Sequence, residues 1–297
     1  LVIVLGWFLM QKKMFNENFV DIINKFVFKV SLPVLLFKDI ATTPIRDAFD
    51  PKFVIFCMVG TTIMFMGIWA LTSIFMKDKS MVGAFTQASA RGSAAVLGIA
   101  FVQNIYGNSG MTPLMIVSAV PLYNIYSVII LTFCANNQDH SDKAATIKHA
   151  FKNILTNPII LGIAAGVPFS LLNIELPPLV LKTVTNVAQT ATPMALLAVG
   201  AGFEGRKAIK KLKPTMIATF IKLVALPAIY FPFAIAMGFR ESALVAILIM
   251  VGSPTTVTCY IMAKNGVLSS SIIVMATLLS SVTLTFWIFL LKSMGLI

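Results

Sequence analysis

Long apolar runs follow one another along almost the whole chain. Each is close to the roughly 20 residues that an α-helix needs to cross the hydrocarbon layer of a bilayer. This succession predicts an all-α membrane protein. The runs are Phe19–Ala41, Phe53–Phe75, Met81–Phe101, Met111–Phe133, Ile154–Leu172, Leu181–Ala201, Thr215–Met237, Ala243–Ala263 and Leu268–Leu291.

A tenth apolar run, Leu1–Met10, opens the sequence and is too short to span. We expect it to be the end of a truncated first helix, with a few residues missing before Leu1. It is not expected to be a signal peptide, because it lacks a basic leader and a small-residue cleavage site. Counting this run, the sequence predicts ten transmembrane helices.

The low fraction of charged residues indicates a protein that is surrounded by lipid. Only 11% of the 297 residues are charged, whereas soluble domains carry about 25%. The net charge of +12 would suggest a nucleic-acid partner in a soluble protein. In this chain the basic residues lie in short loops between apolar runs, where they set membrane orientation. A lipid bilayer is therefore the expected partner, and nucleic acid is not.

The basic loops predict the orientation. If both termini lie on one side, the opposite side receives thirteen loop Lys and Arg residues against six. The strongest contribution is the cluster from Arg206 to Lys213. Cytoplasmic loops carry the excess of positive charge, so we expect a multi-pass protein of the inner (cytoplasmic) membrane with both termini outside.

Few residues are available for enzyme chemistry. Cys57, Cys134 and Cys259 lie in different apolar runs and form no CxxC pair, and His140 and His149 share one polar loop. Paired membrane aspartates, a GxSxG elbow and an HExxH helix are absent. We therefore expect no metal site, no cofactor and no enzymatic activity.

The chain matches itself at an offset of 160 residues. Gly6 then meets Gly166, Pro33 meets Pro193, and Gly92-Ser93 meets Gly252-Ser253. This predicts two five-helix repeats, residues 1–135 and 153–297, joined by a cytoplasmic loop at 136–152. Five is an odd number, so the second repeat must be inverted in the membrane. Inverted repeats recur in secondary transporters, whose sites lie near the midplane where helices are broken.

The fourth and ninth runs are the candidate broken helices. Each has a Gly-Ser pair near its centre, and Pro254 removes a backbone donor and disfavours helix at the residue before it. Freed backbone groups at this depth are tolerated only beside protein or a water-filled cavity. The alternative is that Pro254 only kinks a packed helix. The candidate substrate-binding residues here are Gly92, Ser93, Gly252, Ser253, Pro254, Thr255 and Thr256.

Arg91 lies halfway along the fourth run. An arginine at the centre of a membrane helix costs about 2.5–3.5 kcal/mol on insertion scales. No carboxylate occupies the middle of any apolar run, so backbone carbonyls, water or an anionic substrate remain as partners. Its guanidinium suits bidentate binding of a carboxylate. The alternative is a structural role in capping the carbonyls of the break.

Other polar residues in the runs give weaker predictions. Asn124 and Gln87 either line a cavity or bond to a neighbouring helix. Gly162 and Gly166 form a GxxxG pair that predicts close helix packing. A proton relay through buried carboxylates is not expected, because none is available. Sodium could be held by neutral oxygens at the breaks, with candidates Ser93, Ser253 and Thr258 and, more loosely, Thr255 and Thr256.

Several segments resemble the auxin efflux carrier family, in the bacterial branch that includes malate and malonate permeases. They are SLPVLLFKDIA, QASARGS, TPMALLAVGAGFE and GSPTTVTCYIMAKNG. The resemblance implies two inverted five-helix repeats with crossing, broken fourth and ninth helices. It also implies a scaffold of helices 1, 2, 6 and 7 and a transport domain of helices 3–5 and 8–10 that moves as an elevator.

The resemblance further implies an organic anion as substrate, with Arg91 and the two Gly-Ser pairs at the site. This chain departs from the family pattern at Ser93, where many relatives have Asn, and its fourth helix lacks the crossing proline of plant carriers. Auxin is therefore not predicted.

The sequence thus predicts a secondary active transporter of a small organic anion, with a carboxylate as the expected class. Two alternatives remain: a sodium-coupled symporter of a larger amphipathic anion, and an anion channel. Coupling to sodium or to protons, and assembly as a homodimer, are left open.

Overall fold

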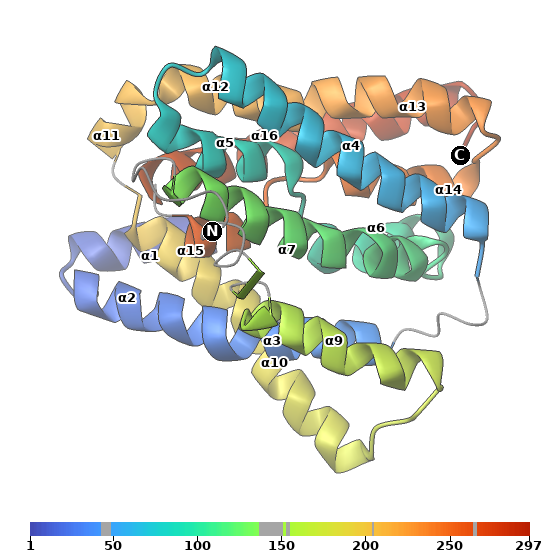
Figure 1. The fold of residues 1–297 in the computed structure, drawn as a ribbon, viewed down its shortest axis with the longest axis horizontal. Coiled ribbons are helices and arrows are strands. Elements are labelled where there is room, and N and C mark those ends of the chain that lie inside the picture. The colour runs from blue at the N-terminus through green and yellow to red at the C-terminus, as the bar shows by residue number, and fades with distance from the viewer. Residues whose placement is uncertain (43–48, 137–150, 153–154, 204, 264–265) are drawn as a thin grey trace.

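The computed structural model describes residues 1–42, 49–136, 151–152, 155–203, 205–263 and 266–297. All named elements in this part of the chain are helices. Figure 1 shows them in two layers, with the blue and yellow helices of one layer beneath the cyan, green, orange and red helices of the other. The predicted loop 136–152 lies almost entirely outside the described residues.

The first layer joins the beginning of the chain to its middle. Within it, α1 packs against α10, and α3 packs against both α9 and α10. The helices α2, η1 and α3 follow one another without a gap and correspond to one predicted span. The bounds in this layer are α1 Val2–Gln11, α2 Glu17–Phe26, η1 Val27–Ser31, α3 Leu32–Ala41, α9 Pro158–Leu171 and α10 Pro178–Ala201.

The second layer contains the remaining helices. α4 packs against α5 and α7, α14 packs against α6 and α7, and α16 packs against α5 and α12. The bounds are α4 Pro51–Phe75, η2 Lys79–Met81, α5 Val82–Ala90, α6 Ala94–Tyr106, α7 Thr112–Asn136, α11 Gly205–Lys210, α12 Leu212–Phe220, η3 Ile221–Ala225, α13 Leu226–Ala236, α14 Glu241–Gly252, α15 Thr258–Met262 and α16 Gly266–Ser293.

Side-chain caps fix where three of these helices begin. The Asn16 side chain accepts from the N–H of Phe19, that of Asp50 from Lys52 and Phe53, and that of Asn157 from Ile159. Each cap satisfies amides that have no partner in the first helical turn. This is why these three helices begin two to four residues from the ends of the predicted apolar runs.

The outer surface of the long helices is apolar. Four described helical segments are long and apolar enough to cross a membrane: 51–75, 112–134, 212–236 and 266–293. On α16 the exposed apolar residues recur every three or four positions, which puts them on one face. Such a stripe would be unfavourable in water and suits contact with lipid. The stripe consists of Leu278, Val282, Phe286 and Phe289.

Glycines bring the first-layer helices into backbone contact. A Cβ added to Gly6 would lie 2.2 Å from the carbonyl oxygen of Leu197, and one added to Gly200 would lie 1.9 Å from that of Ile3. Gly162 faces the Pro33 carbonyl in the same way, at 2.4 Å. The close packing predicted from the GxxxG pair on α9 is confirmed, and α3 is its partner.

We expect Gly200→Ala to destabilise the protein because backbone must move to admit the methyl group. Overpacking of this kind costs about 1–3 kcal/mol, which lowers Tm by several degrees. The control is Gly67→Ala on α4, where an added Cβ meets nothing within 4 Å. There the better helix propensity of Ala should raise stability slightly. Thermal unfolding in detergent measures the Tm of both variants. A Tm of Gly200→Ala that rises as much as that of Gly67→Ala would contradict the packing of α1 on α10.

Candidate functional site

Two spans of the second layer are interrupted near their centres. The fourth predicted span is helical up to Ala90 and again from Ala94, and the ninth predicted span is helical up to Gly252 and again from Thr258. Arg91 and Ser253, the first residues after the stops, have extended backbone with ψ of 118° and 154°. Pro254 accounts for the second interruption, since the residue before a proline is driven out of the helical region.

The two interruptions pair with each other. Gly92 and Thr255 form an antiparallel bridge, and the N–H of Ser93 donates to the carbonyl of Pro254 at 2.9 Å. The Thr255 hydroxyl donates to the carbonyl of Ala88 at 2.7 Å. Backbone groups that would be costly in the apolar interior are therefore satisfied by the opposite break. The pairing holds the two crossing segments in a fixed register.

Lys222 holds the ends of the two interrupted helices together. Its side chain is fully buried, and Nζ donates to the carbonyls of Ala90 at 2.9 Å and Met250 at 3.2 Å. The Met250 carbonyl would ordinarily accept from residue 254, but Pro254 has no N–H. Tyr123 donates its hydroxyl to the same carbonyl at 2.9 Å. The ammonium thus lies where two helix C-termini, each carrying partial negative charge, converge.

A π-helical turn carries Lys222. The turn η3 comes directly before Leu226 and Pro227. Pro227 cannot donate to the carbonyl of Leu223, which accepts instead from the Trp287 indole N–H at 3.0 Å. π-Turns often occur at functional positions, because they change the direction of one side chain without ending the helix.

Within the described part of the chain, Arg91 has only uncharged hydrogen-bond partners. The guanidinium donates to Asn124 Oδ1 at 2.6 Å, to Met262 Sδ at 3.3 Å and to Ser127 Oγ at 3.4 Å. These bonds use three of its five N–H groups. The side chain is 4% exposed. The guanidinium bonds to no carbonyl of the break, so the capping role considered for Arg91 belongs to Lys222.

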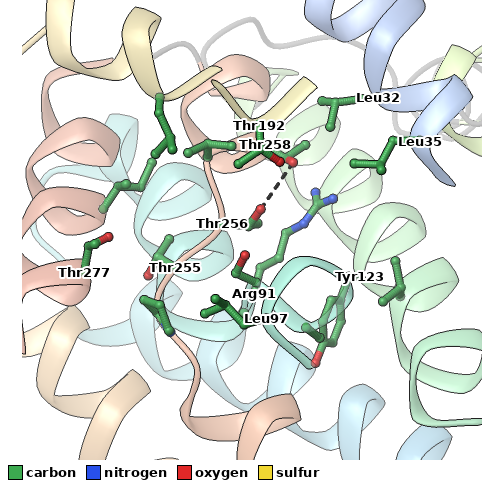
Figure 2. Close-up of a pocket in the computed structure, with 18 of the residues that line it drawn as sticks. Leu32, Leu35, Arg91, Leu97, Tyr123, Thr192, Thr255, Thr256, Thr258 and Thr277 are labelled. Carbon is green, nitrogen blue, oxygen red and sulfur yellow. Dashed lines mark hydrogen bonds between the residues drawn. The ribbon is translucent and has the colours of Figure 1, made fainter. Parts of the chain in front are cut away.

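A cavity of about 190 Å³ lies between the two layers at the crossing. Figure 2 shows Arg91 extending along it, with Thr255, Thr256 and Thr258 on one side and leucines of α3 on the other. The volume is below the roughly 300 Å³ at which pockets for drug-sized ligands begin, so the site fits a small molecule. Most of the side chains that line the cavity are aliphatic or carry a hydroxyl. Besides Tyr123 and residues of the two breaks, they are Leu32, Leu35, Leu36, Leu97, Val120, Leu196, Ile273, Thr192 and Thr277.

The cavity includes some of the residues singled out in the sequence and not others. Arg91, Gly92, Ser93, Pro254, Thr255, Thr256 and Thr258 line it. Asn124 does not; it is fully buried behind Arg91 and positions the guanidinium. Gly252 packs against Pro227, and Ser253 is buried with its hydroxyl unpartnered. The candidate sodium ligands are therefore split, with Ser93 and Thr258 on the cavity and Ser253 off it.

Sequence reasoning missed Lys222, Thr192 and Thr277. Lys222 gave a usable signal, because it lies inside the apolar run 215–237 just as Arg91 lies inside its own. The same insertion cost applies to both cations. Thr192 and Thr277 gave none, since a threonine inside a helix can bond back to the carbonyl of its own preceding turn.

Residues 1–288 match the family model described as "Membrane transport protein". The chain belongs to this family. The resemblance to auxin efflux carriers noted in the sequence is thereby confirmed. Members of this family are transporters and not enzymes, so the chain is a multi-pass membrane transport protein with no enzymatic role. A relative from Rhizobium meliloti (strain 1021), named "Putative malonate transporter", is 25% identical over 283 residues, covering 91% of this chain and 87% of its own length.

Proposed function

We propose that this membrane transport protein is a secondary active carrier of a small organic anion, a carboxylate. The observation that carries the proposal is the buried guanidinium of Arg91, which lies on a small cavity at a crossing of two interrupted helices. Among the described residues it hydrogen-bonds only to uncharged groups. A carboxylate would satisfy the N–H groups of Arg91 that these bonds leave over. The printed name of the Rhizobium meliloti relative, "Putative malonate transporter", agrees with this chemistry.

Two glycine contacts support the inverted five-helix repeats. Gly6 meets the carbonyl of Leu197, and Gly166 meets the carbonyl of Phe37. The offset of 160 residues that relates Gly6 to Gly166 also relates Phe37 to Leu197. The two contacts are therefore equivalent under the repeat found in the sequence. Equivalent packing of α1 on α10 and of α9 on α3 is what two copies of one unit would produce.

The layers suggest how the carrier works. We propose the first layer as the scaffold, helices 1, 2, 6 and 7, and the second as the transport domain. The cavity has walls from both layers, with Leu35 and Thr192 from the first and Arg91 and Thr255 from the second. Sliding of the second layer along the first would carry the anion across by an elevator motion. The orientation with both termini outside, in the cytoplasmic membrane, stays a prediction from the basic loops.

Reconstituted protein should exchange external radiolabelled malonate for internal unlabelled malonate. Exchange should saturate and should show counterflow, because the binding site of a carrier reorients with substrate bound, whereas a channel does not reorient for each molecule that passes. Empty liposomes and heat-unfolded protein are the controls. Flux that rises linearly with concentration and lacks counterflow would favour a channel. Absence of flux for malonate and for simple monocarboxylates would reject the proposed function.

The driving ion needs its own measurement. If neutral oxygens at the breaks hold sodium, replacing sodium by N-methylglucamine should lower the initial rate, and Thr258→Val should remove the difference. If protons drive transport instead, an imposed pH gradient should change the rate in the absence of sodium.

A further inference from the structure

Lys222 contributes little net charge to the cavity. The ends of α5 and α14 that it binds each carry about half a negative charge. Together they offset the single positive charge of the ammonium. Both hydrogen-bonded carbonyls, Ala90 and Met250, belong to these ends. Moreover, Lys222 does not line the cavity, whereas Gly92 does, and a Cβ added to Gly92 would lie 3.0 Å from Lys222 Nζ.

Arg91 is the one ionisable cation among the described residues that line the cavity. The other ionisable side chain on its described walls is Tyr123, and a phenol is neutral at physiological pH. The N-terminus of α6, which opens on the cavity at Ser93 and Ala94, adds about half a positive charge. The site therefore offers between one and two positive charges, and nothing else on its described walls is charged.

A fully ionised dicarboxylate would bring two negative charges into this space. One could pair with the guanidinium, while the second would have only the partial charge of the α6 N-terminus, among leucines and threonine hydroxyls. Leaving a charge unpaired at membrane depth is costly. A hydroxyl can instead bond to a protonated carboxyl or to another neutral polar group at little cost.

We propose that the site binds one carboxylate charge at a time, as a monocarboxylate or as a dicarboxylate in its singly protonated form. This inference rests on the proposed function and narrows its substrate class. The charged end lies at Arg91, beside the break at Ser93, and the uncharged remainder packs against Leu32, Leu35 and the threonines. Dicarboxylate binding then depends on pH through the substrate itself.

Three probes that differ in charge test the inference on purified wild-type protein. Monomethyl malonate carries one charge, methanedisulfonate carries two at every accessible pH, and malonate passes from one to two. We expect the Kd of malonate to rise about tenfold per pH unit above its second ionisation, because one proton is taken up with the anion. The Kd of monomethyl malonate should stay constant over the same range, which controls for titration of the protein. Methanedisulfonate should bind at least about tenfold more weakly than the ester.

A malonate Kd that does not change across the second ionisation would overturn the inference, as would methanedisulfonate binding as tightly as the ester. Either result would leave the proposed function intact, whereas failure of every probe to bind or exchange would reject both. A variant supplies the converse test. Thr277→Lys adds a cation to the cavity wall and should improve methanedisulfonate binding relative to the ester by about tenfold, with Thr277→Met as the uncharged control.

Discussion

Arg91→Gln is expected to abolish measurable anion exchange and to weaken anion binding by about 100-fold or more. Two hydrogen bonds from a guanidinium to a carboxylate are worth about 1.5–3 kcal/mol each, and about 1.4 kcal/mol corresponds to a factor of ten in Kd. The variant should still insert and fold, since removing an arginine from membrane depth relieves an insertion cost. Isothermal titration with monomethyl malonate and counterflow in liposomes measure the two effects.

Arg240→Gln is the matched control, because Arg240 is exposed at the start of α14 and bonds only to backbone carbonyls. Arg91→Lys separates charge from geometry: it keeps one positive charge but loses the planar pair of donors. We expect its affinity to lie between those of the wild type and Arg91→Gln. Exchange at the wild-type rate in a folded Arg91→Gln protein would remove the guanidinium from the mechanism.

Lys222→Met is expected to reduce anion affinity by about tenfold or more with a smaller effect on stability. The two hydrogen bonds of the ammonium contribute about 1.5–3 kcal/mol each. Taking an ammonium out of water costs several kcal/mol. When methionine fills the same volume, the loss of the two hydrogen bonds is therefore nearly cancelled by the relief of this desolvation cost. The carbonyl of Met250 also keeps Tyr123 as a donor. Function suffers more, because the two helix ends would then present negative charge beside the cavity.

Lys213→Met controls for loss of a lysine from the same span, since Lys213 is exposed in α12. Its anion affinity and melting temperature should match those of the wild type. For Lys222→Met, binding of monomethyl malonate within twofold of the wild type would show that the ammonium does not balance the helix ends. A loss of folded protein in Lys222→Met alone would instead mean that its two hydrogen bonds outweigh its desolvation cost.

The positions of the two cations show how far the sequence could lead. Arg91 was identified because an arginine inside an apolar run has few tolerable surroundings. Lys222 also lies inside an apolar run but was not identified from the sequence. It is Lys222 that caps the helix-end carbonyls, the role considered for Arg91. Its partners, Ala90 and Met250, lie 132 and 28 residues away in the sequence, and no local pattern links them. Which cation caps helix ends and which is left for a ligand depends on where three separate spans meet.

The sequence by itself determined that the chain lies in a lipid bilayer, roughly where its helices run, and where two of them are interrupted. Apolar length, Pro254 and the Gly-Ser pairs act locally, through hydrogen bonds along one segment and the steric limits of one residue. Only the tertiary structure decided that Gly92 pairs with Thr255, that Asn124 lies behind Arg91, and that Ser253 lies off the cavity. These outcomes depend on how far helices approach and rotate, which is set by side-chain packing between segments distant in the chain.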